Sequence, residues 1–187
     1  MLRGGRFEHR PYAGYHAESI VKEYILAMDV TIRGYREEDR ERLAELFDDF
    51  QDYLVALDPL RRLRHLPGYG EEALARTLDE VREKRGAFAV ALDGKTIVGF
   101  IVGILQERKN RRDVIDSMGG RVTDLYVDSA YRGRGIGTLL MQHIEAYFRM
   151  NGCDVAQVEV FVPNAPARRL YEKFGYEHRD IDTMKNL

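Results

Sequence analysis

The sequence has a single cysteine, Cys153, among its 187 residues. One cysteine excludes an internal disulfide and a cysteine-rich metal site, and it favours a reducing, cytoplasmic setting. Long hydrophobic runs are also absent. None approaches the roughly 20 residues of a membrane span, and the N-terminus lacks the apolar core of a secretory signal. The sequence therefore predicts a soluble cytoplasmic protein with no membrane contact and no metal.

A strong excess of one charge is missing too. The chain carries 29 Lys and Arg residues against 31 Asp and Glu residues, for a net charge of −2. This balance gives no indication of a nucleic-acid-binding surface. Hydrophobic residues make up 44% of the chain, which suffices for a core, and 187 residues suit one domain.

The first 27 residues differ from the rest of the chain. They are rich in arginine and glycine at first, and a short helix is expected over residues 17–27. A first strand, starting at Val30, follows soon afterwards. We interpret residues 1–27 as an N-terminal extension whose role the sequence does not reveal, and residues 28–187 as the domain itself.

Hydrophobic periodicity divides the domain into helices and strands. Intervals of three and four predict amphipathic helices over residues 38–57, 71–84, 139–150 and 165–174. Alternating or β-branched runs predict strands over residues 30–33, 88–92 and 96–105, a strand ending at 127, and strands over 155–162 and 176–185. Asp93-Gly94 predicts a tight hairpin between the second and third strands, and Asn164 is the expected cap of the last helix. An exposed loop is expected over residues 107–113. This order predicts an α/β or α+β domain around a mixed sheet.

Residues 122–138 are the most informative stretch. A hydrophobic run ends at Val127, and the next predicted helix is preceded by three glycines at alternate positions, Gly133, Gly135 and Gly137. Such a turn leaves the backbone N–H groups at the positive end of a helix open to an anion. Arg132 and Arg134 add positive charge suited to a pyrophosphate. The pattern predicts a phosphorylated cofactor.

Two common phosphate-binding loops do not match this stretch. The P-loop has a lysine directly after its second glycine, and no lysine follows these glycines. The dinucleotide fingerprint requires a third glycine or alanine where Thr138 stands, and it normally lies in the first strand–helix unit of its domain. Both interpretations are therefore disfavoured.

A third interpretation rests on a resemblance. Residues 132–137 match the pattern Arg or Gln, two residues, Gly, one residue, Gly or Ala, which marks the acyl-coenzyme A site of the GNAT superfamily of N-acetyltransferases. Leu125-Tyr-Val-Asp precedes the turn as in that family's fourth strand. The family's later motif, Asn-x-x-Ala-x-x-Leu-Tyr-x-x-x-Gly-Phe/Tyr, is similar to Asn164, Ala167, Leu170, Tyr171, Phe174, Gly175 and Tyr176. The resemblance extends from about residue 28 to the C-terminus and is specific over residues 124–176.

The resemblance implies a mixed, mostly antiparallel sheet flanked by helices, with splayed central strands. It implies that acetyl-coenzyme A binds where the fourth and fifth strands separate, with its pyrophosphate on the glycine turn and its pantetheine arm along the fourth strand. The cofactor-binding residues carried over in this way are Leu125, Tyr126, Val127, Arg132, Gly133, Arg134, Gly135, Ile136, Gly137, Thr138 and Asn164.

The same resemblance implies the chemistry. An amine attacks the thioester directly, without a covalent enzyme intermediate. Tyr171 resembles the family's general acid, a phenol that protonates the departing thiolate. Asp124 resembles an acidic position near the amine, although Thr123 stands where many members carry Glu before this acid. Asp124 is therefore the candidate base, and the alternatives are Glu159, Glu37 and Glu38.

The implied function is an acetyl-coenzyme A-dependent N-acetyltransferase that acts on a primary amine of a small molecule or a protein. The alternative is a non-catalytic acyl-coenzyme A-binding module. The sequence does not specify the acceptor: the arginines within residues 61–69 favour an acidic one, whereas Asp124 and Glu159 favour a cationic one. Dimerisation is common in the superfamily, so the resemblance allows a homodimer, but no stretch of the chain specifies one.

Overall fold

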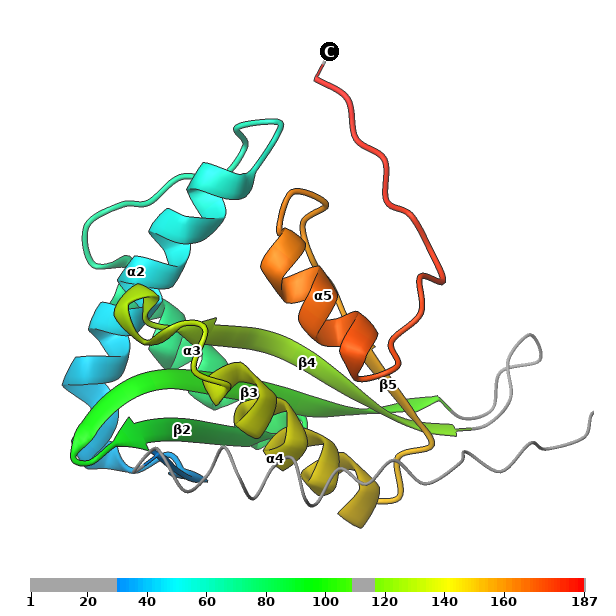
Figure 1. Ribbon diagram of the computed structural model, residues 1–187, viewed down its shortest axis with the longest axis horizontal. Coiled ribbons are helices and arrows are strands. Elements are labelled where there is room, and N and C mark those ends of the chain that lie inside the picture. Colours follow the sequence, from blue (N-terminus) through cyan, green and yellow to red (C-terminus); the bar gives the residue numbers. More distant parts are fainter. Residues whose placement is uncertain (1–29, 109–116, 187) are drawn as a thin grey trace, which may run out of the picture.

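The computed structural model describes residues 30–108 and 117–186. Its centre is a five-stranded sheet in the order β1-β2-β3-β4-β5, with helices on both faces (Figure 1). The strands are β1 (Val30–Gly34), β2 (Ala87–Asp93), β3 (Thr96–Arg108), β4 (Ser117–Val127) and β5 (Val155–Val158). The extension predicted for residues 1–27, with its helix, lies outside the described residues.

Neighbouring strands run antiparallel, except for β4 and β5, which are parallel. A parallel pair needs a long crossover connection, and here α4 (Ile136–Met150) supplies it. The predicted hairpin between β2 and β3 is confirmed, with Gly94 in the left-handed conformation at a φ of 59°. The prediction of a mixed, mostly antiparallel sheet is likewise confirmed.

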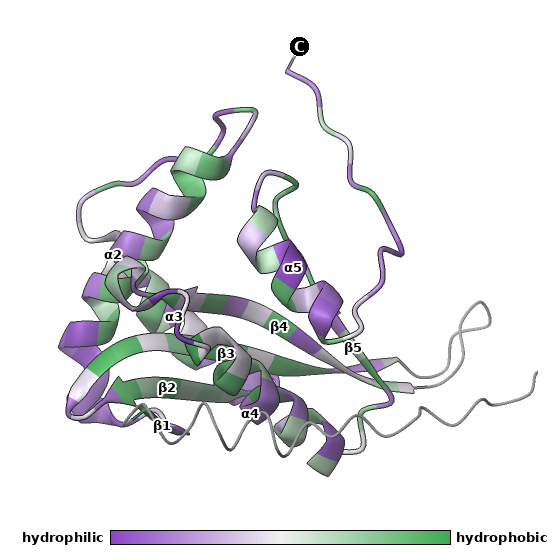
Figure 2. Cartoon of the chain, viewed as in Figure 1, coloured by the Kyte–Doolittle hydropathy of each residue, from purple (hydrophilic) through white to green (hydrophobic). Residues whose placement is uncertain are grey.

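The helices form two layers. A short 3-10 helix, η1 (Glu37–Asp39), leads into α2 (Arg40–Leu57), which packs with α3 (Tyr69–Glu83) on one face of the sheet. On the other face lie α4 and α5 (Ala165–Lys173). Figure 2 shows apolar residues along β2 and β3 and mixed polarity along the helices. None of the helices in the described chain is long and apolar enough to cross a membrane.

Alternation along the strands sends different side chains to the two faces. In β2, the large residues Phe88, Val90 and Leu92 belong to the core under α2 and α3. The small residues Ala89 and Ala91 belong to the core under α4 and α5. The sheet therefore offers a bulky surface to one layer and a shallow surface to the other, which lets α4 approach the sheet closely.

Three predictions about strand boundaries need correction. The fifth strand ends at Val158 instead of residue 162, because the chain there leaves β4. The strand predicted over residues 176–185 is absent, and this segment runs extended without a sheet partner. Its residues are mostly exposed and charged, so they offer no apolar face to bury. The loop predicted from residue 107 begins later, because β3 continues to 108, and residues 109–113 lie outside the described residues.

Candidate active site

The two strands at the parallel edge of the sheet separate partway along their length. β4 and β5 pair from Gly119 with Val155 to Val122 with Val158, and β4 then continues alone to Val127. A groove of about 2460 Å³ lies at this separation, lined by β4, the turn after it, the chain after β5, and α5. Small-molecule pockets usually measure roughly 300–1,000 Å³. This groove therefore has room for an extended cofactor together with an acceptor.

A β-bulge lies at the point of separation. Val102 pairs with Asp124 and Gly103 pairs with Val122, so Thr123 is an extra residue in β4. A bulge bends its strand and increases the local twist, which accounts for the divergence of the rest of β4 from β5. The Thr123 Oγ1 is buried and has no hydrogen-bond partner among the described residues.

The open edge of β4 presents particular backbone groups to the groove. The Asp128 N–H donates to the Val98 carbonyl oxygen at 2.9 Å, so these two residues form a hydrogen-bonded pair. Along an antiparallel ladder, hydrogen-bonded pairs alternate with pairs that are not hydrogen-bonded. The backbone N–H and C=O groups of Tyr126 therefore face β3, and those of Leu125 and Val127 face the groove. An extended ligand can pair with Leu125 and Val127 as an added strand would.

The glycine turn follows another short 3-10 helix, η2 (Ser129–Tyr131). Gly133 and Gly135 have φ values of 78° and 81°, a left-handed conformation that glycine adopts without steric cost. Within the described chain, no acceptor is recorded for the backbone N–H groups of residues 133–137, whereas the Thr138 N–H donates to the Gly135 carbonyl oxygen at 3.0 Å. The unpaired groups stand at the positive end of α4, where anions bind readily.

The two arginines of the turn point in different directions. The Arg132 Nε donates to the Val127 carbonyl oxygen at 2.8 Å, and its guanidinium carbon lies 4.4 Å from the centre of the Tyr53 ring of α2. Arg132 therefore lies across the end of the groove. The Arg134 Nη1 lies 4.0 Å from the Asp93 Oδ2, on the side of the β2–β3 hairpin.

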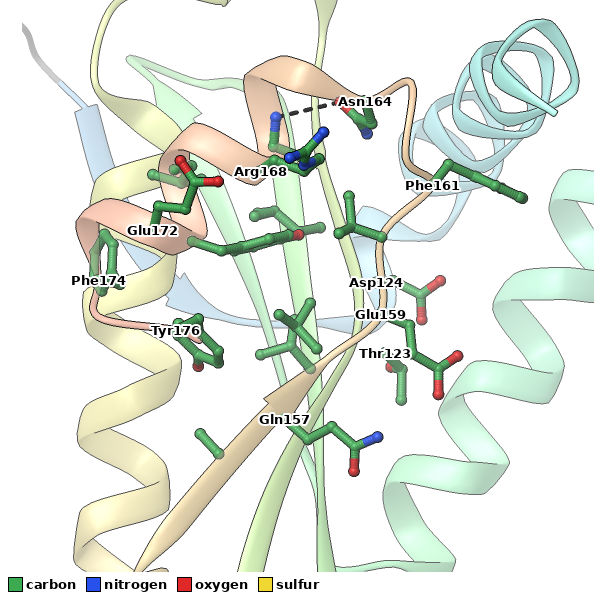
Figure 3. Close-up of a pocket in the computed structure, with 18 of the residues that line it drawn as sticks. Thr123, Asp124, Gln157, Glu159, Phe161, Asn164, Arg168, Glu172, Phe174 and Tyr176 are labelled. Carbon is green, nitrogen blue, oxygen red and sulfur yellow. Dashed lines mark hydrogen bonds between the residues drawn. The ribbon is translucent and has the colours of Figure 1, made fainter. Parts of the chain in front are cut away.

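Asn164 begins α5, and its predicted role as the helix cap is confirmed. Its Oδ1 accepts from the Ala167 N–H at 3.2 Å, drawn in Figure 3, and from the Tyr53 hydroxyl at 3.0 Å. Two donors on the same oxygen fix the orientation of the amide. The Asn164 Nδ2 then carries the donors, and no acceptor for it is recorded in residues 30–108 and 117–186.

Tyr171 lies on α5, lines the groove and is only 8% exposed. Burial, and to a lesser extent the Asp124 carboxyl, raises the pKa of Tyr171 to about 12. The phenol is therefore protonated at neutral pH. Its ring packs 5.9 Å from the ring of Tyr176, so Tyr171 contributes to the core and also holds a proton beside the groove.

Asp124 is half-buried in the same groove. Burial raises the pKa of its carboxyl and Glu80 of α3 raises it further, whereas the Thr123 side chain and Arg76 oppose the shift. Figure 3 shows Thr123, Asp124 and Glu159 on the side of the groove that faces α3. A carboxylate with a raised pKa is a better proton acceptor near neutral pH.

Comparison with known proteins identifies the family. The profile of the acetyltransferase (GNAT) family matches residues 40–176. The chain belongs to this family. An uncharacterized N-acetyltransferase of Methanocaldococcus jannaschii is 34% identical over 95 residues, 50% of this chain and 54% of that protein. The L-amino acid N-acetyltransferase AaaT of Escherichia coli is 34% identical over 87 residues, 46% of this chain and 49% of that protein.

The alignment with each of these two relatives spans about half of that relative's length. A solved structure, of a mutant of the BH1408 protein from Bacillus halodurans, superposes with a TM-score of 0.73 and 22% identity. That comparison covers 84% of this chain and 99% of the other. At this identity the likeness shows the fold alone, and it agrees with the sheet and the two helical layers described above.

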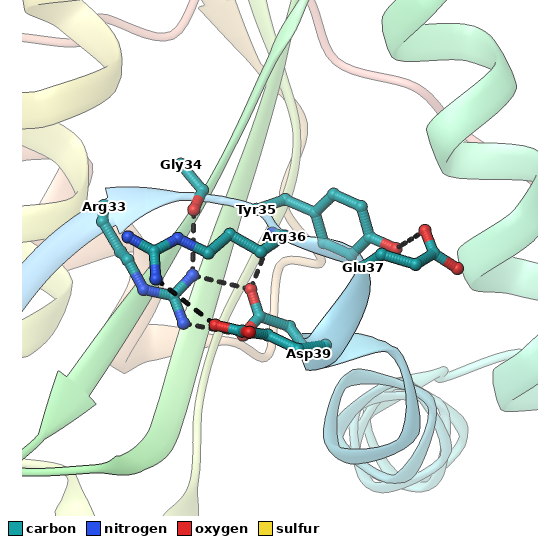
Figure 4. A network of polar contacts seen from close by, with 7 residues as sticks. Arg33, Gly34, Tyr35, Arg36, Glu37 and Asp39 are labelled. Carbon is teal, nitrogen blue, oxygen red and sulfur yellow. Dashed lines mark hydrogen bonds and ion pairs between the residues drawn. The ribbon is translucent and has the colours of Figure 1, made fainter.

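The other carboxylates considered as bases in this GNAT domain are placed less favourably. Glu159 follows β5 and is ion-paired, because the Arg121 Nη2 donates to its Oε1 at 2.8 Å. Glu37 and Glu38 belong to η1, and neither lines the groove. Glu37 accepts a hydrogen bond from the Tyr35 hydroxyl at 2.9 Å in the polar network of Figure 4. Asp124 is the candidate that lines the groove without an ion pair among the described residues.

Sequence reasoning missed Tyr53. In the sequence it is one more position of the helix predicted over residues 38–57, and no local motif distinguishes it. Its partner Asn164 lies 111 residues further along the chain. Only the tertiary structure brings this tyrosine to the groove, between two residues that the resemblance had assigned to the cofactor.

Proposed function

We propose that this chain is an acetyl-coenzyme A-dependent N-acetyltransferase in which a primary amine attacks the thioester directly. The observation that carries the proposal is the arrangement of groups around one groove. Unpaired N–H groups stand at one end, an open strand edge runs along it, and a buried phenol lies beside it. The curated relatives named N-acetyltransferases support the same activity.

We assign the cofactor to the groove in an extended form. The unpaired N–H groups of residues 133–137 suit a pyrophosphate. The backbone groups of Leu125 and Val127 suit the amides of the pantetheine arm, and the Asn164 Nδ2 supplies further donors. Tyr126 contributes the wall under the arm through its buried ring. When bound, acetyl-coenzyme A supplies the acetyl group as an activated thioester.

The chain's own residues accept one proton from the amine, donate one proton to the leaving sulfur and stabilise the negative charge that develops on the thioester oxygen. Asp124 accepts the proton that the attacking amine must lose, directly or through water. Tyr171 donates its phenolic proton to the leaving sulfur when the C–S bond breaks, after the C–N bond has formed. The Leu125 N–H, which faces the groove, stabilises the oxyanion of the tetrahedral intermediate.

The loop between α2 and α3, which lines the groove at Asp58 and Leu60, favours an acceptor that carries a carboxylate. Glu159 is neutralised by Arg121, and burial disfavours the charged form of Asp124. These two carboxylates therefore give little support to a polycationic acceptor. The loop between α2 and α3 has three exposed arginines, Arg61, Arg62 and Arg64. No ion pair is recorded for them in the described chain, so they can attract an anionic group.

The test is a thiol-release assay with acetyl-coenzyme A and a panel of amines. The panel contains L-amino acids, peptides with acidic residues, polyamines and aminoglycosides. We expect turnover with at least one carboxylate-bearing amine. Coenzyme A binding without turnover of any acceptor would instead identify a non-catalytic binding module, and an absence of binding would reject the proposal altogether.

The assignment of Tyr171 is tested with Tyr171→Phe, which keeps the packed ring and removes the proton. Loss of a general acid costs roughly 100- to 10,000-fold in rate, so kcat should fall within that range while coenzyme A affinity stays within about twofold of the wild type. Tyr147→Phe is the control, because its hydroxyl donates to the Arg85 carbonyl oxygen at 2.7 Å, away from the groove. Unchanged turnover in Tyr171→Phe would rule out the general-acid role.

A further inference from the structure

Tyr53 connects the two helical layers at the groove. It belongs to α2, which packs on one face of the sheet, and it is half-buried. Its hydroxyl donates to the Oδ1 of Asn164, at the start of α5 on the opposite face, at 3.0 Å. Its ring lies under the guanidinium of Arg132, 4.4 Å from the ring centre to the guanidinium carbon. One side chain of α2 therefore contacts both Asn164 and Arg132 at the groove.

The contact with Asn164 determines how that amide presents its donors. The Ala167 N–H alone would leave the side chain free to rotate about its cap position, since a cap needs only one accepted hydrogen bond. The second bond, from Tyr53, engages the same oxygen from another direction. The Nδ2 donors are then directed away from both partners, and their orientation is set before any ligand binds.

The contact with Arg132 determines where that guanidinium lies. A cation over an aromatic face is attracted by the negative face of the ring, and Tyr126 offers a second ring at 5.3 Å. The same guanidinium group donates through Nε to the Val127 carbonyl oxygen, on the open edge of β4. Tyr53 thus keeps Arg132 at the end of the groove, beside the unpaired N–H groups of the glycine turn.

We propose that Tyr53 is a positioning residue of the cofactor site, which pre-orients the Asn164 amide donors toward the pantetheine arm and holds Arg132 at the mouth of the groove. The inference rests on the proposed function, because it requires that coenzyme A binds in this groove. It assigns to α2 a part in cofactor binding. Pre-orientation lowers the entropy that binding must overcome, so its loss weakens binding more than it slows the chemical step.

The experiment measures coenzyme A binding by isothermal titration calorimetry, together with the kinetics of acetyl transfer. Tyr53→Phe keeps the ring under Arg132 and removes the hydrogen bond to Asn164. We expect the dissociation constant of coenzyme A and the KM for acetyl-coenzyme A to rise about fivefold, in the range of one hydrogen bond. The values of kcat and of the acceptor KM should stay within about twofold. Tyr147→Phe, which also removes one hydrogen-bonded tyrosine hydroxyl, should change none of these values.

A double-mutant cycle tests whether Tyr53 acts through Asn164. Asn164→Ser keeps a helix cap but is too short to reach Tyr53. In that background, Tyr53→Phe should weaken coenzyme A binding by less than about twofold. Equal binding by Tyr53→Phe and Tyr147→Phe would overturn the inference, and so would a full fivefold effect in the Asn164→Ser background. Wild-type protein that binds no coenzyme A would instead reject the proposed function, and the inference with it.

Discussion

The two sides of the groove present different kinds of groups to a ligand. On the side of α4 and α5 most of them belong to the backbone: the N–H groups of residues 133–137 and the open edge of β4 at Leu125 and Val127. On the side of α2 and α3 they are side chains, of Tyr53 and Asp124 above all. Backbone groups are set by strand register and glycine conformation, whereas side chains depend on contacts between distant segments.

The loop between α2 and α3 extends this contrast. The Asp58 carboxylate accepts hydrogen bonds from the N–H groups of Leu60 and Leu63, each at 2.9 Å, and holds the loop at its start. Arg61 has a φ of 53°, a conformation uncommon for a residue other than glycine. On this side the Asp58 side chain holds a loop in which Arg61 has an unfavourable backbone conformation. On the other side the left-handed positions are glycines, which adopt this conformation without strain.

A substitution at Gly120 tests whether α4 needs the shallow surface of the sheet to pack closely. A Cβ at this position would lie inside contact distance of the buried Phe148 ring of α4, with ring atom Cδ1 at 2.6 Å. Gly120→Ala should therefore destabilise the fold by about 2–3 kcal/mol, because an overpacked core must shift its side chains or backbone. Urea unfolding followed by circular dichroism measures the change.

The neighbouring glycine provides the matched control. A Cβ at Gly119 would meet its nearest atom, the Val155 Cγ1, at 3.5 Å, an ordinary contact. Gly119→Ala should change the free energy of unfolding by less than about 0.5 kcal/mol, because the added methyl group meets only ordinary contacts. Equal destabilisation by the two variants would show that α4 does not depend on the shallow surface of the sheet.

On the other face, a buried ion pair holds the connection between β1 and α2. Asp39 is 3% exposed, and its two carboxylate oxygens accept from Arg33 at 2.7 Å each (Figure 4). Burial alone disfavours the charged carboxylate, but the hydrogen bonds from Arg33 and from the Arg36 N–H lower the pKa of Asp39 below 3.8. Arg33→Gln should cost about 1–2 kcal/mol at pH 7, because it leaves a buried charge underpaired.

The pH dependence distinguishes this charge effect from a packing effect. A carboxyl whose native pKa is lowered stabilises the fold above its unfolded pKa, and this contribution disappears as the pH falls through the native pKa. The difference between the wild type and Arg33→Gln should therefore shrink in acid. A difference that stays constant from pH 7 to pH 3 would contradict the assignment. Arg82→Gln is the control, since its pair with Asp79 is exposed and worth little.

The features that the sequence predicted well are those with a local cause. The glycine turn, the cap at Asn164 and the hairpin at Gly94 depend on residues that are neighbours in the chain. The early end of β5 depends on where two strands separate, which no local pattern encodes. The same reason explains why Tyr53 was missed and why Glu159 looked available before its ion pair with Arg121 was seen.

The smallest effect is expected at His65, in the loop between α2 and α3. Its Nδ1 and Nε2 lie 2.7 Å from carboxylate oxygens of Asp52 and Asp48, which raise the pKa of the imidazole above 6.5. A raised native pKa stabilises the fold fully below the unfolded pKa, and the contribution is lost as the pH rises through the native value. Thermal unfolding should therefore show His65→Gln less stable than the wild type at pH 6, with the two converging toward pH 9.

A matched control for this histidine is His178→Gln, because His178 is 66% exposed and lies 3.9 Å from its nearest carboxylate. It should show no such dependence on pH. A difference for His65→Gln that is the same at pH 6 and pH 9 would mean that the loop is held by neutral hydrogen bonds and not by a charged imidazole. In that case the arginines of this loop would need no charged support to face an acceptor.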